Sequence, residues 1–321
     1  MENKFRWAYI GSGSICKKTA DEITKVNHEI VTVYSRNFER CSDFAKRYGA
    51  TPCHSFEEAV NRDDIDGVYI GTPHTSHKEY AIAAIRLKKP VLCEKPIGIN
   101  IEEVEEIIQV AKEENVYFSE AMWTWFSPVA LKVKSWVDEG KIGELKDCYG
   151  SFCIPGFIGR KADHRLLNPL TAGGSLLDLG IYPITYIYNL FGMPKEIICT
   201  GTLKGGIDTE EVVTLVYETG KCELKSSLDY PEEKMEIRGS LGEIKVGPAF
   251  HCGKKAKLKT DTEKEVFKDE TSYAIEFTRV AEEIVAGKKE SDFVPFQHTI
   301  DCMKIMDECR KQLGLHYEVE D

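Results

Sequence analysis

Short apolar runs alternate with amphipathic segments along the first third of the chain. The runs are rich in β-branched and aromatic side chains, as β-strands are. Their positions are 7–10, 29–35, 66–71, 90–93 and 116–118. Three of the segments between them open with a capping residue. Ser55 and Ser76 each precede a glutamate by three residues, and Asn100 caps the helix that begins with Ile101-Glu102-Glu103. Strands separated by helices imply right-handed crossovers and a parallel sheet.

The rest of the chain has a different pattern. Helical spacing predicts helices at 127–140, 174–191, 273–286 and 297–313. Apolar runs joined by glycine-containing turns predict strands at 144–153, 197–203, 212–218, 221–228, 234–238 and 243–246. Consecutive strands without intervening helices predict a mostly antiparallel sheet.

These patterns predict an α/β protein with two domains. We expect an N-terminal Rossmann-type domain with a parallel sheet over residues 1–122. An α+β domain with a large, mostly antiparallel open sheet should follow over residues 123–321. A chain of 321 residues fits two domains of about 150 residues each.

Composition narrows the class of protein. Hydrophobic residues make up 42 % and charged residues 30 % of the chain, an ordinary globular balance, and the formal charge is 42 − 53 = −11. An acidic chain repels phosphate backbones, so we expect no nucleic-acid partner. No apolar stretch approaches the roughly 20 residues of a membrane helix, and the N-terminus lacks a signal-peptide pattern, so we expect no membrane partner.

Cysteine is unusually frequent. The chain has 11 cysteines, an odd number, and no Cys-x-x-Cys spacing. This pattern suggests neither a zinc ribbon nor a thioredoxin-type redox site. Unpaired thiols persist best in a reducing compartment, so we expect a cytoplasmic protein. Cys16 and Cys93 are the cysteines that we expect beside the ligand site.

A glycine-rich turn follows the first predicted strand and precedes a helix. Its sequence is Gly11-Ser12-Gly13-Ser14-Ile15-Cys16. Gly11 permits the turn, Gly13 lets a pyrophosphate approach the backbone, and the helix N-terminus supplies N–H donors and partial positive charge. Cys16 occupies the third position, which should be small and which cysteine fills less well than glycine or alanine. In this setting the motif predicts a dinucleotide site.

The end of the second strand separates the two nicotinamide cofactors. NAD sites usually place a carboxylate there, whereas this chain has Ser35 and Arg36. A serine and an arginine can bind a 2′-phosphate that a carboxylate would repel. We therefore expect NADP as the cofactor, with NAD as the alternative if Arg36 is only a surface charge that stacks on adenine.

Two further strand ends should lie at the same edge of the sheet, where ligands of parallel sheets bind. Thr72-Pro73-His74 and then His77 follow one strand, and Glu94-Lys95-Pro96 follows another. The histidines can also be capping or solvated residues, and the Glu-Lys pair can be a structural ion pair. His74 and His77 lack a third ligand in sequence, so we expect no metal site.

Together these motifs resemble the glucose-fructose oxidoreductase / inositol dehydrogenase / MocA family. The segments Glu120-Ala121-Met122-Trp123-Thr124 and Gly173 to Pro183 resemble its branch of dimeric dihydrodiol dehydrogenases and NADP-dependent D-xylose dehydrogenases. The similarity spans nearly the whole chain and includes the Ser272-Tyr273 helix start. It implies a homodimer formed through the C-terminal sheet.

The resemblance assigns roles to residues. Asp178 and Tyr182 are four residues apart and should share a helix face. In the family this face looks toward the lysine of the Glu-Lys-Pro motif, so Tyr182 would be the general acid/base, Lys95 would tune it, and Asp178 would orient the substrate or the lysine. The expected substrate-binding residues are Trp123, Trp125, Arg165, Asp178 and Tyr182. The expected cofactor-binding residues are Gly11, Ser12, Gly13, Ser14, Ile15, Ser35, Arg36, Thr72, Pro73, His74, His77, Glu94, Lys95 and Trp123.

The expected activity is hydride transfer between NADP(H) and the CH–OH group of a cyclic sugar, polyol or trans-dihydrodiol. Two readings stay open beside it. One is a keto-sugar reductase of the same family that uses NAD(H). The other is a non-catalytic NADP-binding regulator. Tyr182 can also be a core aromatic, and Arg165 a structural ion-pair partner.

Overall fold

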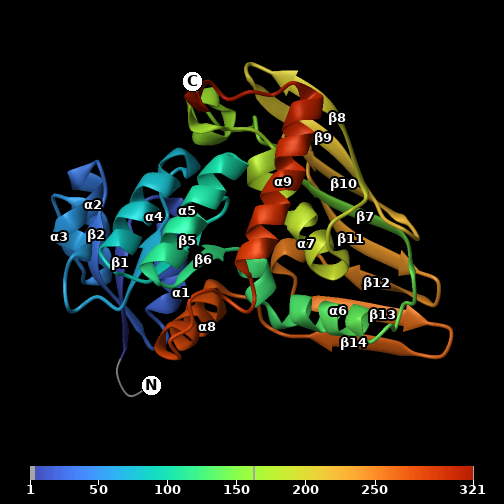
Figure 1. Ribbon diagram of the computed structural model, residues 1–321, viewed down its shortest axis with the longest axis horizontal. Helices are drawn as coiled ribbons and strands as arrows, with labels where there is room; N and C mark the ends of the chain where they lie inside the picture. The colour runs from blue at the N-terminus through green and yellow to red at the C-terminus, as the bar shows by residue number, and fades with distance from the viewer. Residues whose placement is uncertain (1–3, 162, 321) are drawn as a thin grey trace. The chain divides into compact units, whose positions relative to one another are not determined.

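The computed structural model describes residues 4–161 and 163–320. The chain divides into two compact units (Figure 1). Unit 1 comprises Met1–Trp123 and Ser272–Thr299, and unit 2 comprises Thr124–Thr271 and Ile300–Asp321. The sequence placed residues 272–299 in the second domain, whereas in the structure they pack with the first. No helix of the described residues is long and apolar enough to cross a membrane.

Unit 1 is built on a six-stranded parallel sheet in the order β3-β2-β1-β4-β5-β6. This confirms the predicted parallel sheet. The order reverses direction between β1 and β4, the switch point at which such sheets bind ligands. The strands are β1 (Phe5–Ile10), β2 (His28–Tyr34), β3 (Thr51–Cys53), β4 (Gly67–Ile70), β5 (Val91–Glu94) and β6 (Phe118–Ala121). The helices are α1 (Ser14–Ile23), α2 (Phe38–Tyr48), α3 (Phe56–Val60), α4 (His77–Arg86) and α5 (Ile101–Glu114).

Local capping explains most of these helix starts. Ser55 and Asn100 accept hydrogen bonds from the backbone N–H groups of Glu58 and Glu103, as expected of N-caps. The predicted cap at Ser76 is wrong, because its hydroxyl donates instead to the carbonyl of Pro73 at 3.0 Å. Helix α4 still begins at the next residue, which follows a short 3-10 turn.

Helix α8 (Tyr273–Val285) belongs to unit 1 because of an aromatic cluster. Phe277 on this helix lies 5.0 Å, between ring centroids, from both Trp7 and Tyr69, and 6.4 Å from Tyr9. All four side chains are fully buried. The core beneath the parallel sheet is therefore completed by Phe277, which contacts Trp7 and lies more than 150 residues after the end of β6, the last strand of that sheet.

Unit 2 is built on an eight-stranded sheet in the order β14-β13-β12-β11-β7-β10-β9-β8. Only β7 and β10 pair in parallel, so the predicted mostly antiparallel sheet is confirmed. The strands are β7 (Leu145–Cys153), β8 (Glu196–Lys204), β9 (Ile207–Val216), β10 (Lys221–Ser227), β11 (Glu232–Gly239), β12 (Gly242–Val246), β13 (Lys255–Thr260) and β14 (Lys264–Lys268). The helices are α6 (Pro128–Asp138), α7 (Ile181–Phe191) and the part of α9 (Phe296–Leu313) that follows Thr299.

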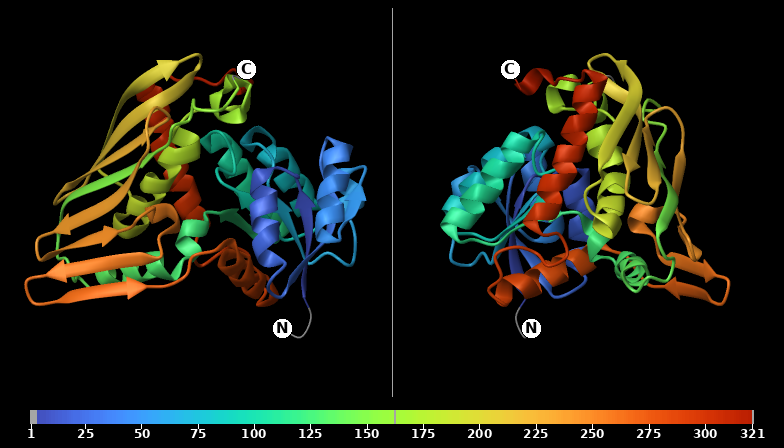
Figure 2. Two further views of the ribbon diagram at one scale, coloured as in Figure 1. Left: turned by 180° about the vertical axis from the view of Figure 1, so that it is seen from behind. Right: turned by 45° about the vertical axis from the view of Figure 1, so that its right-hand side comes forward.

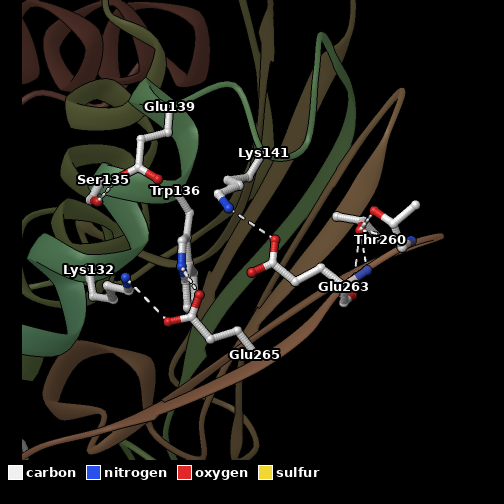
Figure 3. A network of polar contacts seen from close by, with 9 residues as sticks. Lys132, Ser135, Trp136, Glu139, Lys141, Thr260, Glu263 and Glu265 are labelled. Carbon is white, nitrogen blue, oxygen red and sulfur yellow. Dashed lines mark hydrogen bonds and ion pairs between the residues drawn. The ribbon is translucent and has the colours of Figure 1, made fainter.

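Helices of unit 2 lie along one face of this sheet (Figure 2). The opposite face carries alternating charges, such as the Arg238–Asp147 pair at 2.9 Å and the Lys245–Glu236 pair at 3.3 Å. The β13–β14 hairpin was missed in the sequence. It is tied to α6 by Glu265, which accepts a hydrogen bond from Trp136 and pairs with Lys132 (Figure 3).

Candidate functional site

The glycine-rich turn of unit 1 has the geometry of a phosphate-binding turn. Gly11 has φ +118°, a conformation that side chains disfavour, and a Cβ there would lie 2.8 Å from the carbonyl oxygen of Gly71. Gly13 has no atom within 4 Å of the place where a Cβ would stand. It also precedes α1, and its position provides no side-chain cap for that helix. The backbone N–H groups at the start of α1 are thus available to an anionic ligand.

Cys16 fits the third position of the motif because Gly71 makes room for it. The Cys16 sulfur lies 3.4 Å from the Gly71 carbonyl oxygen, and a Cβ on Gly71 would lie 2.5 Å from that sulfur. The sequence-based interpretation that cysteine fits this position less well did not include the space left by the missing side chain of Gly71. Burial raises the pKa of the Cys16 thiol to about 12, and it raises the pKa of Cys93 as well. Both cysteines pack as small apolar side chains.

A pocket of about 290 Å³ opens on this turn. Two arginines at the end of β2 and the start of α2, Arg36 and Arg40, line it together with Ser35. Thr72 also lines it, and its buried hydroxyl has no hydrogen-bond partner among the described residues. The pocket lining includes these predicted cofactor-binding residues: Gly11, Ser12, Gly13, Ser35, Arg36, Thr72 and Pro73. The remaining predicted residues are not among those that line it: Ser14, Ile15, His74, His77, Glu94, Lys95 and Trp123.

The donors of this pocket suit a dinucleotide with a phosphate on its adenosine ribose. Arg36, Arg40 and Ser35 would hold that phosphate, and the N-terminus of α1 would hold the pyrophosphate. Arg40 was missed in the sequence, although it lies one helical turn after Arg36. No carboxylate is among the residues that line the pocket.

Lys95 follows β5 and lies near buried carboxylates of unit 1. The neighbouring Glu94 is 8 % exposed and accepts a 2.7 Å hydrogen bond from the Tyr69 hydroxyl. Glu120 on β6 is 4 % exposed and accepts a 3.0 Å hydrogen bond from the Thr299 hydroxyl. Burial raises the pKa of Glu120 to about 7, while the nearby Lys95 charge opposes this rise. Glu120 was not predicted as a site residue from the sequence, although a glutamate inside an apolar strand is a signal for a functional residue.

His77 ties two of the strand-end loops together. Its Nδ1 lies 2.8 Å from the Pro96 carbonyl oxygen, and its Nε2 lies 2.8 Å from the Thr72 carbonyl oxygen. His74 is 5 % exposed in the preceding 3-10 turn. The structure thus gives His77 a positioning role for Thr72. Direct contact of either histidine with a cofactor stays a prediction.

Trp123 and Trp125 occupy different environments. Trp123 belongs to unit 1, is 9 % exposed and stacks on Tyr273 at 4.3 Å between ring centroids. Trp125 belongs to unit 2, is fully buried and packs on Tyr186 at 5.0 Å. Its place in the core does not support the expectation that Trp125 contacts substrate.

Asp178 lies on a π-helical turn of unit 2, Leu176–Gly180, that runs into α7. The helix predicted from Gly174 therefore begins at Leu176 as a π-helical turn, so the four-residue spacing of a regular α-helix does not by itself place Asp178 and Tyr182 on one face. The guanidinium of Arg165 pairs with the Asp178 carboxylate at 3.2 Å. π-Helical turns are frequent at functional sites.

A buried acid pair holds the start of this turn. Asp208 accepts a 2.6 Å hydrogen bond from the Leu176 N–H, and the Ser175 hydroxyl bonds both Asp208 and Glu211. Burial raises the pKa of Asp208, and burial together with the Asp208 charge raises that of Glu211. Gly174, with φ +132°, leaves no room for a Cβ beside the Asp208 carboxylate. This packing explains the glycine at position 174, and a Cβ on Gly173 would lie 2.6 Å from the carbonyl oxygen of Arg165.

Tyr182 lies on the first turn of α7 among aromatic rings of unit 2. It is 8 % exposed, and its ring centroid lies 5.4 Å from that of Phe152 and 5.3 Å from that of His251. Glu233 on β11 accepts a 2.5 Å hydrogen bond from His251 Nδ1. His251 carried no signal in the sequence, because it lies in a short 3-10 turn outside every predicted element.

Comparison with known proteins agrees with this arrangement. Residues 5–122 match a family described as "Oxidoreductase family, NAD-binding Rossmann fold", and residues 130–245 match its C-terminal domain. The chain is 31 % identical to an NADP(+)-dependent scyllo-inositol 2-dehydrogenase from Bacillus subtilis over 98 % of this chain and 99 % of that protein. This chain belongs to the glucose-fructose oxidoreductase / inositol dehydrogenase / MocA family. The sequence-based assignment is confirmed.

A further relative and a solved structure extend the comparison. A trans-1,2-dihydrobenzene-1,2-diol dehydrogenase from Danio rerio is 29 % identical over 97 % of this chain and 98 % of its own. A 3-ketoreductase from Actinomadura kijaniata, solved with NADP and TDP-benzene, shares the fold with a TM-score of 0.84 and 22 % identity, covering 97 % of this chain and 98 % of that one. The present family member is an NAD(P)-dependent oxidoreductase that acts on CH–OH groups.

Proposed function

We propose that this family member oxidises the CH–OH group of a cyclic sugar, polyol or trans-dihydrodiol with NADP, or catalyses the reverse reduction. The observation that carries the proposal is the phenol of Tyr182, which is 8 % exposed at the start of α7, directly after the π-helical turn that carries the Asp178–Arg165 pair. The names of the inositol and dihydrodiol dehydrogenases support this substrate class. The Arg36 and Arg40 pair supports NADP over NAD.

In the proposed mechanism, Tyr182 exchanges a proton with the substrate oxygen. When bound, the nicotinamide supplies or accepts the hydride. By the family resemblance, Lys95 would contribute a positive charge that favours the phenolate form and stabilises a developing alkoxide. Glu94 and Glu120, which lie near Lys95, hold that charge in unit 1. Asp178, kept in place by Arg165, orients the substrate hydroxyl groups.

Replacing Tyr182 by phenylalanine tests the proton transfer. We expect Tyr182→Phe to lower kcat by at least roughly 100-fold, because general acid/base catalysis contributes 10²–10⁴, and to leave NADPH affinity unchanged. The assay is NADPH fluorescence and turnover against aldoses, polyols and trans-dihydrodiols. Tyr186→Phe is the matched control, because its hydroxyl lies in the core of the same helix without a hydrogen-bond partner among the described residues.

The outcomes separate the alternatives. An unchanged kcat in Tyr182→Phe would remove Tyr182 from the mechanism. Faster turnover of keto-sugars with NADH would favour the keto-sugar reductase instead. NADPH binding without turnover across the panel would favour a non-catalytic regulator.

We also propose that the protein is a cytoplasmic homodimer that pairs through the outer face of the unit 2 sheet. All 11 cysteines are free thiols, which suits a reducing compartment. No helix of the described residues covers the outer sheet face, where Tyr149 lies beside Glu232 at 2.7 Å. Light scattering should give twice the mass of the chain, and a charge reversal at Arg238 should weaken the dimer. A monomeric mass at working concentration would contradict it.

A further inference from the structure

Three aromatic rings from three elements of unit 2, one of them the Tyr182 phenol, pack together. His251 stacks on Phe152, with ring centroids 4.5 Å apart and an interplanar angle of 17°. The same imidazole meets Tyr182 in a T-shaped contact at 5.3 Å and 61°. Phe152 belongs to β7, Tyr182 to α7 and His251 to the 3-10 turn Phe250–Cys252. The imidazole is thus wedged against the ring that the proposed function makes the proton carrier.

Glu233 fixes both the position and the charge of this imidazole. Its Oε1 accepts hydrogen bonds from His251 Nδ1 at 2.5 Å and from the His251 backbone N–H at 3.2 Å. The side chains of the pair are 20 % and 18 % exposed, so solvent screens the charges only in part. The His251 carbonyl in turn accepts a 2.7 Å hydrogen bond from the Thr124 hydroxyl. The turn that carries the imidazole is therefore held from two sides.

The imidazole is charged at neutral pH. Burial acts to lower its pKa, but hydrogen bonding to Cys252 and Glu233 and the charge of Glu233 outweigh burial and raise the pKa of His251 to about 9. The titratable groups that face it from packed elements are Glu233 on β11, Cys252 on its own turn and Tyr182 on α7. A neutral aromatic side chain would fill the same space, so packing alone does not call for a charged ring here.

We propose that His251 and Glu233 are positioning residues for Tyr182: the imidazolium, aimed by Glu233, fixes the phenol ring and favours its phenolate. This inference rests on the proposed role of Tyr182. The physical reason is that an opposite charge next to an ionisable group in a partly desolvated site favours the ionised form. Glu233 by itself would act in the opposite direction, so the effect depends on the imidazolium lying nearer to the phenol ring than the carboxylate does. The T-shaped contact places the centroid of the imidazole 5.3 Å from that of the phenol ring.

The proposal is tested by titrating Tyr182 directly. Full-length protein with ¹³Cζ-labelled tyrosine is titrated by NMR, and the Tyr182 signal is assigned by its loss in Tyr182→Phe. We expect His251→Phe, which keeps an aromatic ring, to raise the Tyr182 titration midpoint by about one pH unit. Glu233→Gln removes the carboxylate that favours the protonated form of His251 and keeps a hydrogen-bonding group. It should therefore move the Tyr182 midpoint in the same direction. His316→Phe, at an exposed histidine of unit 2, is the control and should leave it unchanged.

Turnover adds a second readout. In the oxidation direction, the acidic limb of the kcat–pH profile should shift to higher pH in both variants, together with the NMR midpoint of Tyr182. At high pH, kcat should converge on the wild-type value. A purely structural role would lower kcat at every pH alike. Unchanged Tyr182 midpoints in both folded variants would overturn the proposal. If instead Tyr182→Phe retains full activity, the proposed function fails while the NMR titration still decides the coupling between His251 and Tyr182.

Discussion

Glu276 on α8 gives a prediction about stability and pH. Its side chain is fully buried in unit 1, and neither carboxyl oxygen has a hydrogen-bond partner among the described residues. Burial, reinforced by the negative charges of Glu94 and Glu22, raises the pKa of Glu276 well above its ordinary value of 4.5. The native state therefore keeps this carboxyl protonated over a range of pH in which the unfolded chain already ionises it.

The sign of the effect follows from proton binding. Between the unfolded and native pKa values of Glu276, the native state binds one proton more than the unfolded state, so this group makes the free energy of unfolding fall as pH rises. The slope within that range is about 1.4 kcal/mol per pH unit. Glu276→Gln keeps the shape and removes the proton equilibrium. We expect the stability of the variant to gain on that of the wild type by about 1.4 kcal/mol for each pH unit above the unfolded-state pKa of Glu276, until the native carboxyl ionises.

Urea unfolding at several pH values, followed by tryptophan fluorescence, measures the difference between the two proteins. Other buried acids such as Glu211 contribute a slope of the same sign to both proteins, so the difference isolates Glu276. Glu282→Gln, an exposed change on the same helix, is the control and should leave the wild-type slope intact. Parallel pH dependence in wild type and Glu276→Gln would refute the reasoning.

Three further predictions follow from the same structure. Arg36→Ala should weaken NADPH binding about tenfold and NADH binding little, because it removes a charged donor from the pocket; fluorescence titration measures both, and equal weakening would contradict a 2′-phosphate contact. Gly174→Ala should lower the free energy of unfolding by about 2–4 kcal/mol, because its φ is +132° and its Cβ would meet Asp208; an unchanged urea midpoint would contradict this. Alkylation at neutral pH should label Cys252 before Cys16, because burial raises the pKa of the Cys16 thiol to about 12 while Cys252 is partly exposed; peptide mass spectrometry gives the order.

Local patterns predicted much of the fold. The βα alternation of unit 1 depends on apolar runs and caps that each occupy a few residues, and those signals predicted every strand of its sheet except the three-residue β3. The β13–β14 hairpin was missed because lysines at every second position made a half-buried strand appear polar, although Ala256 and Leu258 between them are buried. The π-helical turn over Leu176–Gly180 was missed because it depends on Asp208, which is distant in sequence.

The candidate site likewise contains residues that local sequence signals predict and residues that depend on contacts distant in sequence. Gly11, Gly13 and Arg36 could be predicted because the dinucleotide motif and its discriminator have fixed spacings. His251 could not, because it contacts Tyr182 only through a turn that three-dimensional packing creates. The thiols Cys16 and Cys93, expected beside the ligand site, are buried with raised pKa values, and we expect their reactivity to be correspondingly low.

The docking of α8 on unit 1 has a consequence for protein synthesis. Phe277 completes the aromatic core around Trp7 and Tyr9, so a nascent chain that ends before this helix lacks part of that core. The nucleotide-binding unit cannot finish folding on the ribosome until most of unit 2 has already emerged. An autonomous nucleotide-binding fragment would therefore need residues 272–299 grafted behind residue 123, with a linker replacing the intervening chain.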